Sequence, residues 1–168
     1  MPESDSSSES NSVQNMIQVL KWLFGLMQKH HVHLCSQVRG SVTLKGKPIA
    51  GIEIKRSLSY ADEEQIDITK TDEQGSFAFE EKSIRSRLPG NILHQPVVRQ
   101  IVYLKYEGEH YVLWYANQRG IEPIPGYTAR LLQLNAELTT EEQVYEIENH
   151  DSLLHPYGVT SICRWPQE

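Results

Sequence analysis

The sequence has little cysteine, no long hydrophobic run and fewer basic than acidic residues. Only two cysteines occur in 168 residues, which excludes a disulfide-dense secreted scaffold. No apolar run approaches the roughly 20 residues needed to cross a bilayer. Sixteen Lys+Arg against 22 Asp+Glu give 16 − 22 = −6, which argues against a nucleic-acid-binding surface and against a polybasic membrane surface.

The common motifs of catalysis are missing as well. The chain contains no G-x-S-x-G, phosphate-binding loop, H-E-x-x-H or C-x-x-C motif. Two acidic pairs, Glu80-Glu81 and Glu141-Glu142, lie in polar, turn-like segments, where solvated surface is the simplest interpretation. We therefore expect a protein that is not an enzyme and that uses no cofactor.

The composition is that of one globular domain with an N-terminal extension. Hydrophobic residues make up 39% of the chain, which is enough for a single core without disulfides or metals. Residues 1–12 contain six serines, three acidic residues and no basic residue. Such a segment cannot bury apolar surface, so we predict a disordered tail over 1–12, a helix over 13–30 and a β domain over 31–168.

Helical spacing marks the segment after the tail, because apolar residues recur there at i, i+3, i+4 and i+7. They are Val13, Met16, Ile17, Leu20, Leu23, Phe24 and Met27. The acidic residues ahead of the segment and the lack of an A-x-A pattern after it argue against a signal peptide. Two roles stay open: the helix packs on its own domain, or it binds a partner or a membrane surface.

From Val32 onward the period of the hydrophobic residues changes from 3.6 to 2. Short alternating runs separated by Gly, Pro and Asp turns predict seven or eight strands and no second helix of any length. The fold class that follows is mainly β, an antiparallel β-sandwich. The connection from Arg85 to Pro96 is long, and long loops in compact domains are often functional.

A hairpin is predicted around Glu107-Gly108-Glu109. Strict alternation places one set of side chains on its first face: Val102, Leu104, Val112 and Trp114. The second face then carries Ile101, Tyr103, Tyr111, Leu113 and Tyr115. Because both sets are largely apolar or aromatic, we expect central strands that are covered on both sides.

Two stretches, Val38–Arg56 and Thr69–Phe79, resemble the prealbumin-like, carboxypeptidase-regulatory-like domains. The G-x-V, G-x-P, G-x-x-I and T-D-x-x-G-x-F elements of that pattern fall on Gly40, Val42, Gly46, Pro48, Gly51, Thr71, Asp72, Gly75 and Phe77. We expect the Gly46 and Gly75 backbones to form tight turns, and Pro48 to lie at a strand edge. Asp72 can accept hydrogen bonds from turn amides. The resemblance implies a prealbumin-like sandwich, a fold used mostly by non-catalytic structural or interaction modules.

Most of the chain from Cys35 to Trp165 is similar to a small family of uncharacterised Gram-negative bacterial proteins. The similarity is carried by Lys55–Tyr60, EEKSIRSRLPG, the VLWY strand and the terminal ICRW. Members of that family look like neighbours of secreted-toxin genes, notably those of type VI secretion. The resemblance therefore implies an immunity or accessory protein that binds an antibacterial effector.

A catalytic alternative follows from another resemblance. Hydroxyisourate hydrolases share the prealbumin-like fold, and the tail HDSLLHPYGVTSICRW is similar to their closing segment. That family uses histidines, an arginine and a C-terminal Tyr-Arg-Gly-Ser. Pro156-Tyr157-Gly158 and Arg164 are present here, but the chain ends in Trp165-Pro166-Gln167-Glu168. Because the terminal motif is missing, we place this alternative last. Its test is a hydrolase activity that His155→Ala abolishes.

Four side chains near the start of the domain are of types that ligate zinc: His30, His31, His33 and Cys35. A spacing of two along one strand is awkward for chelation, and no second ligand group follows at a known spacing. We therefore expect solvent-exposed histidines and no metal site. Cys35 and Cys163 could pair if the terminal strands are neighbours, but we favour two reduced, buried thiols.

Aromatic and basic residues mark a candidate binding surface. The tyrosines of the hairpin's second face could be covered by the N-terminal helix or by a partner protein, and three arginines flank the long connection. The candidate interface residues are Trp22, Phe24, Arg85, Arg87, Arg99, Tyr103, Tyr111 and Tyr115.

The sequence as a whole favours a cytoplasmic protein-binding module. Its acidic net charge fits a basic partner, since complementary charge speeds encounter. The alternatives are a structural adaptor that docks through its N-terminal helix, a membrane contact through residues 13–29, and a periplasmic location. The oligomeric state is open, because an uncapped sandwich edge can dimerise.

Overall fold

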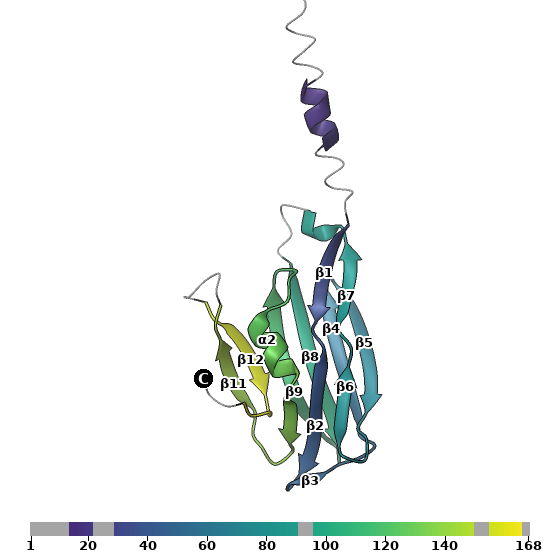
Figure 1. Cartoon of the computed structure of the whole chain (residues 1–168), viewed down its shortest axis with the longest axis vertical. Coiled ribbons are helices and arrows are strands. Elements are labelled where there is room, and N and C mark those ends of the chain that lie inside the picture. The colour runs from purple at the N-terminus through teal and green to yellow at the C-terminus, as the bar shows by residue number, and fades with distance from the viewer. Residues whose placement is uncertain (1–13, 22–28, 91–95, 150–154, 166–168) are drawn as a thin grey trace, which may run out of the picture.

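The computed structural model describes residues 14–21, 29–90, 96–149 and 155–165. The domain has two layers of strands that run along its long axis (Figure 1), and it confirms the predicted mainly β sandwich. The described residues form twelve strands, so the expectation of seven or eight was too low. Strands such as β3 (Lys47–Pro48) are too short to show alternation, and β1 (His30–Cys35) buries four consecutive residues.

The larger layer is a six-stranded sheet in which every neighbouring pair is antiparallel. Its strands, in spatial order, are β11 (Gln143–Ile147), β12 (Tyr157–Ser161), β9 (Glu109–Arg119), β8 (Val97–Tyr106), β4 (Glu53–Tyr60) and β5 (Glu63–Lys70). In β8, buried and less buried residues alternate along the strand, which is typical of a sheet with one face on a core.

The second layer contains a four-stranded sheet and a separate pair of strands. In the sheet, β2 (Val38–Leu44) pairs with β3, with β6 (Ser76–Phe79) and with β10 (Leu134–Glu137). The β10–β2 pair is parallel. A Cβ at Gly40 would lie 2.1 Å from the Leu134 carbonyl oxygen, so the close approach of β10 requires glycine there. The separate pair is formed by β1 and β7 (Lys82–Ser86).

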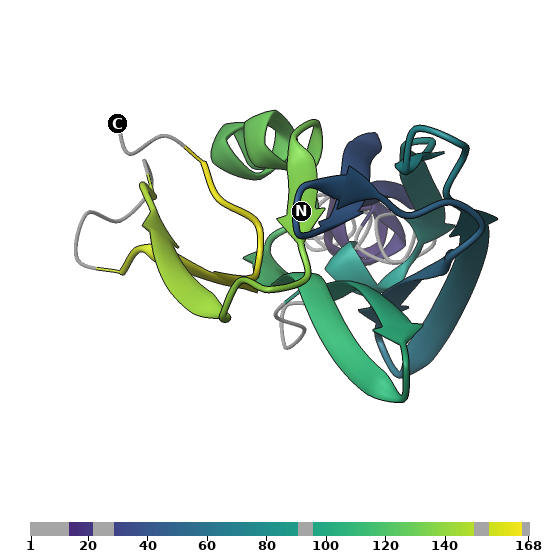
Figure 2. The ribbon, with the colours of Figure 1, turned by 90° about the horizontal axis from the view of Figure 1, so that it is seen from below.

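A second helix exists, contrary to the sequence prediction. Helix α2 (Pro125–Leu131) spans only seven residues, too few for a periodic pattern to be recognised. Its proline at the first position is pre-organised for a helix. The helix packs beside β11 and β12 (Figure 2), where a Cβ at Gly126 would come within 2.4 Å of Ile147 Cγ2. The 3₁₀ turn η1 (Leu88–Gly90) lies within the predicted long connection, of which residues 91–95 are outside the described residues.

The core is centred on Trp114, which is fully buried. Its ring makes edge-to-face contacts with Tyr127 and Trp165, with centroids 5.1 and 6.2 Å apart. Its Nε1 donates to the side-chain oxygen of the buried Gln100 at 3.0 Å. The indole thereby satisfies its one polar group inside the core.

The hairpin formed by β8 and β9 contains a β-bulge that the sequence did not predict. The register shifts between Val102 and Tyr103, so that Val102 pairs with Trp114 and Tyr103 with Val112. Leu113 and Trp114 are consequently both buried. Strict alternation was therefore wrong for this hairpin, because a bulge inserts one residue and reverses the facing of all that follow.

The turn chemistry of the first half is as predicted. Gly46 and Gly75 have φ of 74° and 73°, in the left-handed region that favours glycine. The Asp72 carboxylate accepts from the amides of Gln74 and Ser76 at 2.9 and 2.8 Å. Pro48 lies in β3, at the margin of its sheet.

Residues 14–21 are helical, and all eight are exposed. Strand β1 begins at His30, the last residue of the range predicted for the helix. The predicted tail, residues 1–12, and the residues 22–28 lie outside the described residues. Within the described part of the chain, no helix has the length and apolar character needed to span a bilayer.

Candidate interaction surface

A row of side chains crosses the outer face of the six-stranded sheet from one edge strand to the other. Residues paired across antiparallel strands point to the same face, so the strand registers define the row. It consists of Ile66, Ser57, Ile101, Tyr115, Thr160 and Val144. The next row contains Ile68, Lys55, Tyr103 and Val112. We call this surface the outer sheet face, because the second layer packs on the opposite side.

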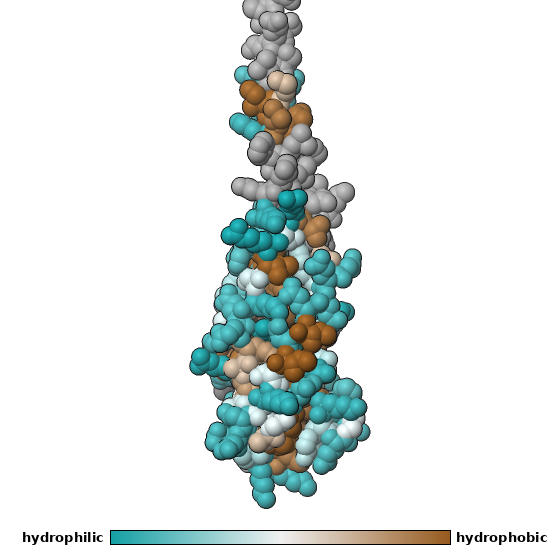
Figure 3. Space-filling view, turned by 90° about the vertical axis from the view of Figure 1, so that its right-hand side faces the viewer, coloured by the Kyte–Doolittle hydropathy of each residue, from teal (hydrophilic) through white to brown (hydrophobic). Residues whose placement is uncertain are grey.

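Exposed hydrophobic residues concentrate on the outer sheet face. The exposed fractions are 53% for Ile66, 56% for Ile68, 43% for Val97, 37% for Tyr115 and 72% for Val144. Figure 3, seen from the β5 side, shows hydrophobic side chains among hydrophilic ones along this edge of the domain. The prediction that both faces of the central strands are covered is therefore wrong for the described residues. Exposed apolar surface of this kind marks interaction sites.

Charge is distributed unevenly over this surface. The half formed by β5, β4 and β8 carries four cations and two anions that point outward: Lys55, Lys70, Arg99, Lys105, Glu53 and Glu64. The Lys55 ammonium lies 3.3 Å from the Glu53 carboxylate. Around β11 and β12 the balance reverses, with Arg119 beside Glu122, Glu146 and Glu148. A partner would therefore meet opposite charges at the two ends of the face, which favours one orientation.

The outer sheet face is hollowed over β12, where the chain carries a glycine. A Cβ built at Gly158 would meet no atom within 4 Å. The hollow has a volume of about 300 Å³, and its lining includes Tyr115, Asn117, Val144, Tyr157, Gly158 and Thr160. A neighbouring cavity of about 330 Å³ beside the start of α2 shares Arg119 and Tyr157 with it. We call the hollow over Gly158 the Gly158 groove.

The predicted interface residues are only partly brought together. Tyr103, Tyr115 and Arg99 lie on the outer sheet face, where Arg99 donates to the Ser59 hydroxyl at 3.2 Å. Tyr111 pairs with the buried Leu104 and packs against the core, so the bulge removes it from this surface. Arg85 belongs to β7 in the other layer, and Arg87 follows that strand. Trp22 and Phe24 lie outside the described residues.

The sequence did not point to Ile66, Ile68 or Val144 as surface residues. In β5, Ile66 and Ile68 alternate with polar residues, which predicts a strand without saying which of its faces is inward. In the structure the inward positions are Gln65, Asp67 and Thr69. Periodicity identifies a strand but does not tell which of its two faces meets the core. The charged partners of Asp67 that mark its side as the inward one, Arg56 and Lys82, are 11 and 15 positions away in the sequence, and residue types alone do not pair them.

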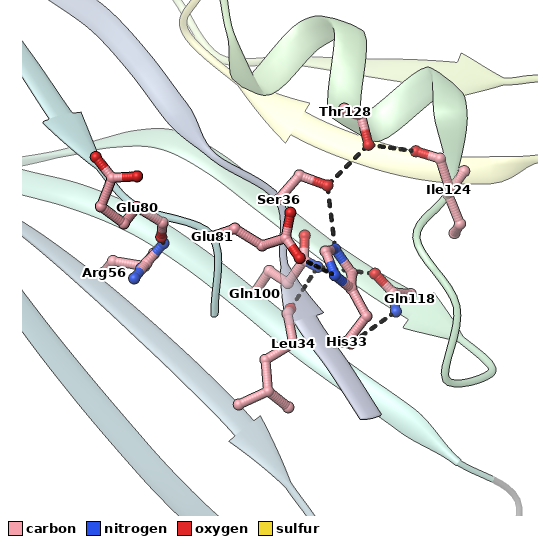
Figure 4. A network of polar contacts seen from close by, with 10 residues as sticks. All are labelled: His33, Leu34, Ser36, Arg56, Glu80, Glu81, Gln100, Gln118, Ile124 and Thr128. Atoms are coloured by element: carbon pink, nitrogen blue, oxygen red, sulfur yellow. Dashed lines mark hydrogen bonds and ion pairs between the residues drawn. The ribbon is translucent and has the colours of Figure 1, made fainter. Parts of the chain in front are cut away.

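A buried polar network lies where β1, β2 and α2 meet (Figure 4). His33 Nε2 is 3.1 Å from the Ser36 hydroxyl, which is 2.8 Å from the Thr128 hydroxyl. The Glu81 carboxylate lies 3.7 Å from His33 Nδ1. On the other side, Gln118 donates to the His33 carbonyl at 3.0 Å. The network links four segments of the chain.

The order Ser36, His33, Glu81 is that of a nucleophile, a base and an orienting carboxylate. Ser36 and His33 are 5% and 4% exposed, however, so neither group is accessible to a substrate in this structure. Burial lowers the pKa of His33, against the opposing effect of Glu81. The network therefore serves to satisfy buried polar groups at the junction of the layers. The expectation that the histidines are exposed holds for His31 and is wrong for His33.

The two thiols are free and buried, as favoured from the sequence. Burial raises the pKa of Cys35 to about 11 and that of Cys163 to about 12. Among the described residues, no group of three or more His, Cys, Asp and Glu side chains is placed to hold a metal ion. Cys35 instead lies beside the Arg56 guanidinium, which partly offsets the effect of burial on its pKa.

The arginine of the hydrolase alternative is engaged in holding the C-terminal segment. Arg164 donates to the Glu141 carbonyl at 2.7 Å and to the Tyr145 hydroxyl at 3.2 Å. It also donates to the Ile162 carbonyl at 3.1 Å. Tyr157 packs edge-to-face on Tyr127 and lines the groove. The hydrolase alternative stays a prediction.

Comparison with known protein families gives one match. Residues 38–141 match the family model described as "Domain of unknown function (DUF6795)", and the chain belongs to this family. Searches of curated proteins and of solved structures give no match. The matched range begins at β2 and extends past β10, so it includes the β4–β5 and β8–β9 hairpins of the outer sheet face.

Proposed function

We propose that this protein is a non-catalytic protein-binding module and that the outer sheet face is its binding surface. The observation that carries the proposal is the row from Ile66 to Val144, in which apolar side chains are exposed on both edge strands and on β9. Interfaces characteristically combine aromatic residues with apolar neighbours and a polar rim. Tyr115, with Tyr103 beside it, supplies the aromatic part.

The partner that we propose is a secreted antibacterial effector of the type VI kind, bound in the cytoplasm by this protein as its immunity or accessory protein. Support for this finer proposal comes from the sequence resemblance to proteins that look like neighbours of toxin genes. The outer sheet face has an excess of cations around β5, β4 and β8 and an excess of anions around β11 and β12. This difference adds support, since an immunity protein must select one effector in one orientation.

The test is co-expression with the product of the gene adjacent to this chain's own gene, which the proposal expects to encode the effector. We expect a stoichiometric complex on size-exclusion chromatography, and growth of cells that the effector alone would kill. A control chain with Tyr115→Ala and Ile101→Asp should lose both effects. Cells that die equally with and without the chain, and no complex at micromolar concentrations, would contradict the proposal.

A structural adaptor is the second candidate, and the N-terminal helix favours it. Within residues 14–21, Met16, Ile17, Val19 and Leu20 are 43–58% exposed. Apolar residues in an amphipathic helix commonly bind a groove on another protein. Ile17→Glu with Leu20→Glu should abolish binding to a secretion-machine component and leave effector binding intact if the adaptor role is real.

A further inference from the structure

We propose that the edge strand β11 binds an extended strand of the protein partner and so adds one strand to the six-stranded sheet. The inference rests on the proposed function, because it says how the partner is held at one end of the outer sheet face. It is carried by three features of β11: an edge without the usual protection, backbone groups that point away from the sheet, and two side chains that fit a particular neighbour.

The two edges of the six-stranded sheet differ in how they are protected against further pairing. Strand β5 has four charged residues among its eight, and charge is a common protection of a sheet edge. Strand β11 has one charged residue, Glu146, among its five, and neither proline nor glycine. Its pairing with β12 is continuous, without a bulge. Figure 1 shows β11 at the margin of the sheet, and in the described part of the chain no strand pairs with its outer side.

The hydrogen bonds next to β11 show which of its backbone groups point away from the sheet. The Ile162 amide, directly after β12, donates to the Val112 carbonyl of β9 at 3.0 Å. Backbone groups alternate in direction along a strand, so the even-numbered residues of β12 bond to β9 and the odd-numbered residues bond to β11. The partners of the odd-numbered residues are Gln143, Tyr145 and Ile147. The amide and carbonyl groups of Val144 and Glu146 therefore point to the open edge.

A second copy of this chain is a poor occupant of the edge, because every two-fold pairing of two β11 strands opposes glutamates. The outward backbone groups belong to Val144 and Glu146, so the two-fold axis would lie at Val144, Tyr145 or Glu146. An axis at Val144 places Glu142 opposite Glu146, and one at Tyr145 places Glu142 opposite Glu148. An axis at Glu146 places this residue opposite its own copy. Like charges directly opposite each other destabilise paired strands, which favours a strand of a different protein.

The outward side chains of β11 define the strand that fits the edge. Val144 is 72% exposed, the largest exposed fraction of any described large hydrophobic residue. Glu146 is exposed and forms no ion pair with a described residue, Arg119 included. A β-branched or aromatic residue opposite Val144 and a lysine or arginine opposite Glu146 are the favourable cross-strand neighbours. The partner strand should therefore carry a basic and an apolar residue separated by one position.

The test is a titration of the full chain with a named probe, the fluorescein-labelled, amidated peptide Thr-Val-Lys-Thr-Ile-Thr-Thr, followed by fluorescence anisotropy. Paired antiparallel to β11, its lysine and isoleucine lie opposite Glu146 and Val144. One control peptide is N-methylated at this lysine and isoleucine, which removes the two amides that would bond to the edge. The other control has glutamate in place of the lysine. We expect the probe to bind at least tenfold more tightly than the N-methylated peptide, and more tightly than the glutamate peptide. Equal binding of the probe and the N-methylated peptide, or no binding of the probe up to millimolar chain, overturns the proposal.

Two substitutions at one position separate the role of the backbone from that of the side chain. Val144→Pro removes an amide that points away from the sheet, a position at which an edge strand tolerates proline. Val144→Ala keeps that amide and removes most of the side chain. The probe should bind at least tenfold more weakly to Val144→Pro than to Val144→Ala, while both variants unfold cooperatively. Equal binding to the two variants overturns the assignment.

Glu146→Lys tests the assignment without changing the backbone. This variant should bind the glutamate peptide more tightly than the probe, the reverse of the unchanged chain. Glu73→Lys, on the exposed turn before β6, is the matched control and should keep the original preference. An unchanged preference in Glu146→Lys overturns the pairing opposite that residue.

The outcome also separates this inference from the proposed function. If a partner requires Tyr115 but binds Val144→Pro and Val144→Ala equally well, only the edge assignment fails. If the probe binds as expected but no protein partner requires the outer sheet face, the edge stands and the proposed function fails. Sedimentation of the chain alone checks the remaining occupant, since a dimer that Val144→Pro dissociates would overturn the assignment to a different protein.

Discussion

The buried Arg56 guanidinium of β4 forms an ion pair with the Asp67 carboxylate of the neighbouring strand β5. Arg56 Nε and Nη2 donate to Asp67 Oδ2 at 3.1 and 2.7 Å, and Lys82 Nζ donates to Oδ1 at 2.6 Å. Arg56 Nη1 also donates to the Glu80 carbonyl at 2.7 Å, and its Cζ lies 4.8 Å from the centroid of the Phe79 ring. This cluster ties the six-stranded sheet to the connection between β6 and β7.

We expect Asp67→Asn to lower the free energy of unfolding by about 3 kcal/mol, because it leaves the 3% exposed Arg56 without its counter-ion. Urea unfolding at pH 7, followed by tryptophan fluorescence, measures the loss. Glu63→Gln, on the exposed start of β5, is the control and should change stability by less than about 0.5 kcal/mol. A loss in Asp67→Asn no larger than in the control would refute the role of the pair.

Stability should fall when the solution is acidified. Five donors surround the Glu137 carboxylate: the Thr43 hydroxyl of β2, the backbone amides of Gly46 and Lys45 in the β2–β3 turn, each at 2.8 Å, and the amide and hydroxyl of Thr139. These hydrogen bonds lower the pKa of Glu137 to about 2 from its ordinary 4.5. Burial alone would raise the pKa of Asp67, but Lys82 and Arg56 outweigh it and lower the pKa.

Because both pKa values are depressed, the stability that these groups contribute is present above the ordinary carboxyl pKa and is lost below it. For Glu137 the loss spans pH 4.5 to about 2. Glu137→Gln should destabilise the protein by about 1 kcal/mol at pH 7 and flatten the decline between pH 4.5 and 2. Urea midpoints measured at half-unit intervals test this. An unchanged pH profile in Glu137→Gln would contradict the assignment.

Two turns should respond to mutation with opposite signs. Ala61 and Asp62 join β4 to β5 with φ of 52° and 65°, a conformation that favours glycine or asparagine. Asp62→Gly should therefore stabilise the protein by roughly 0.5–1 kcal/mol. At Gly75, φ is 73° and a Cβ would lie 2.6 Å from the Val42 carbonyl oxygen, so Gly75→Ala should cost at least about 2 kcal/mol. Thermal midpoints of the two variants, measured under the same conditions, test this prediction. The midpoint should rise in Asp62→Gly and fall in Gly75→Ala, and unchanged midpoints in both would contradict it.

The buried thiols should be inert in the native protein. With pKa values of about 11 and 12 for Cys35 and Cys163, the reactive thiolate is scarce at pH 8. We expect less than about one-tenth of either thiol to react with a disulfide reagent within an hour, and both to react at once in 6 M urea. Rapid modification of either in the native state would show that its segment opens readily.

The sequence was informative wherever a local physical requirement acts on one or two residues. The turn glycines, the Asp72 turn and the hairpin around Gly108 could be located because each needs a particular backbone angle or acceptor. Helix α2 was missed because seven residues are too few for a period, and its proline at the first position was the only local sign. The bulge at Leu113 has no signal in a single sequence, since Leu113 and Trp114 would suit a core or an interface equally well.

The candidate site was harder to predict because it depends on which strands are neighbours. Tyr115, Tyr103 and Arg99 were identified from their residue types, and these three do share a face. Ile66 and Val144 lie on opposite edges of the sheet and are 78 positions apart in the chain, so only the strand order brings them into one row. The Gly158 groove arises from a missing side chain, which has no positive signature in a sequence.

The central claim is that the outer sheet face binds a protein partner. The most direct measurement is affinity purification from the native cell with the chain carrying Ile68→Lys and Val144→Lys, compared with Leu132→Lys. Leu132 is 41% exposed at the end of α2, away from this face, and so serves as a matched control. The account predicts that one stoichiometric partner, retained by the unchanged chain and by Leu132→Lys, is reduced at least tenfold in the double variant. Equal recovery of that partner by all three chains would contradict it.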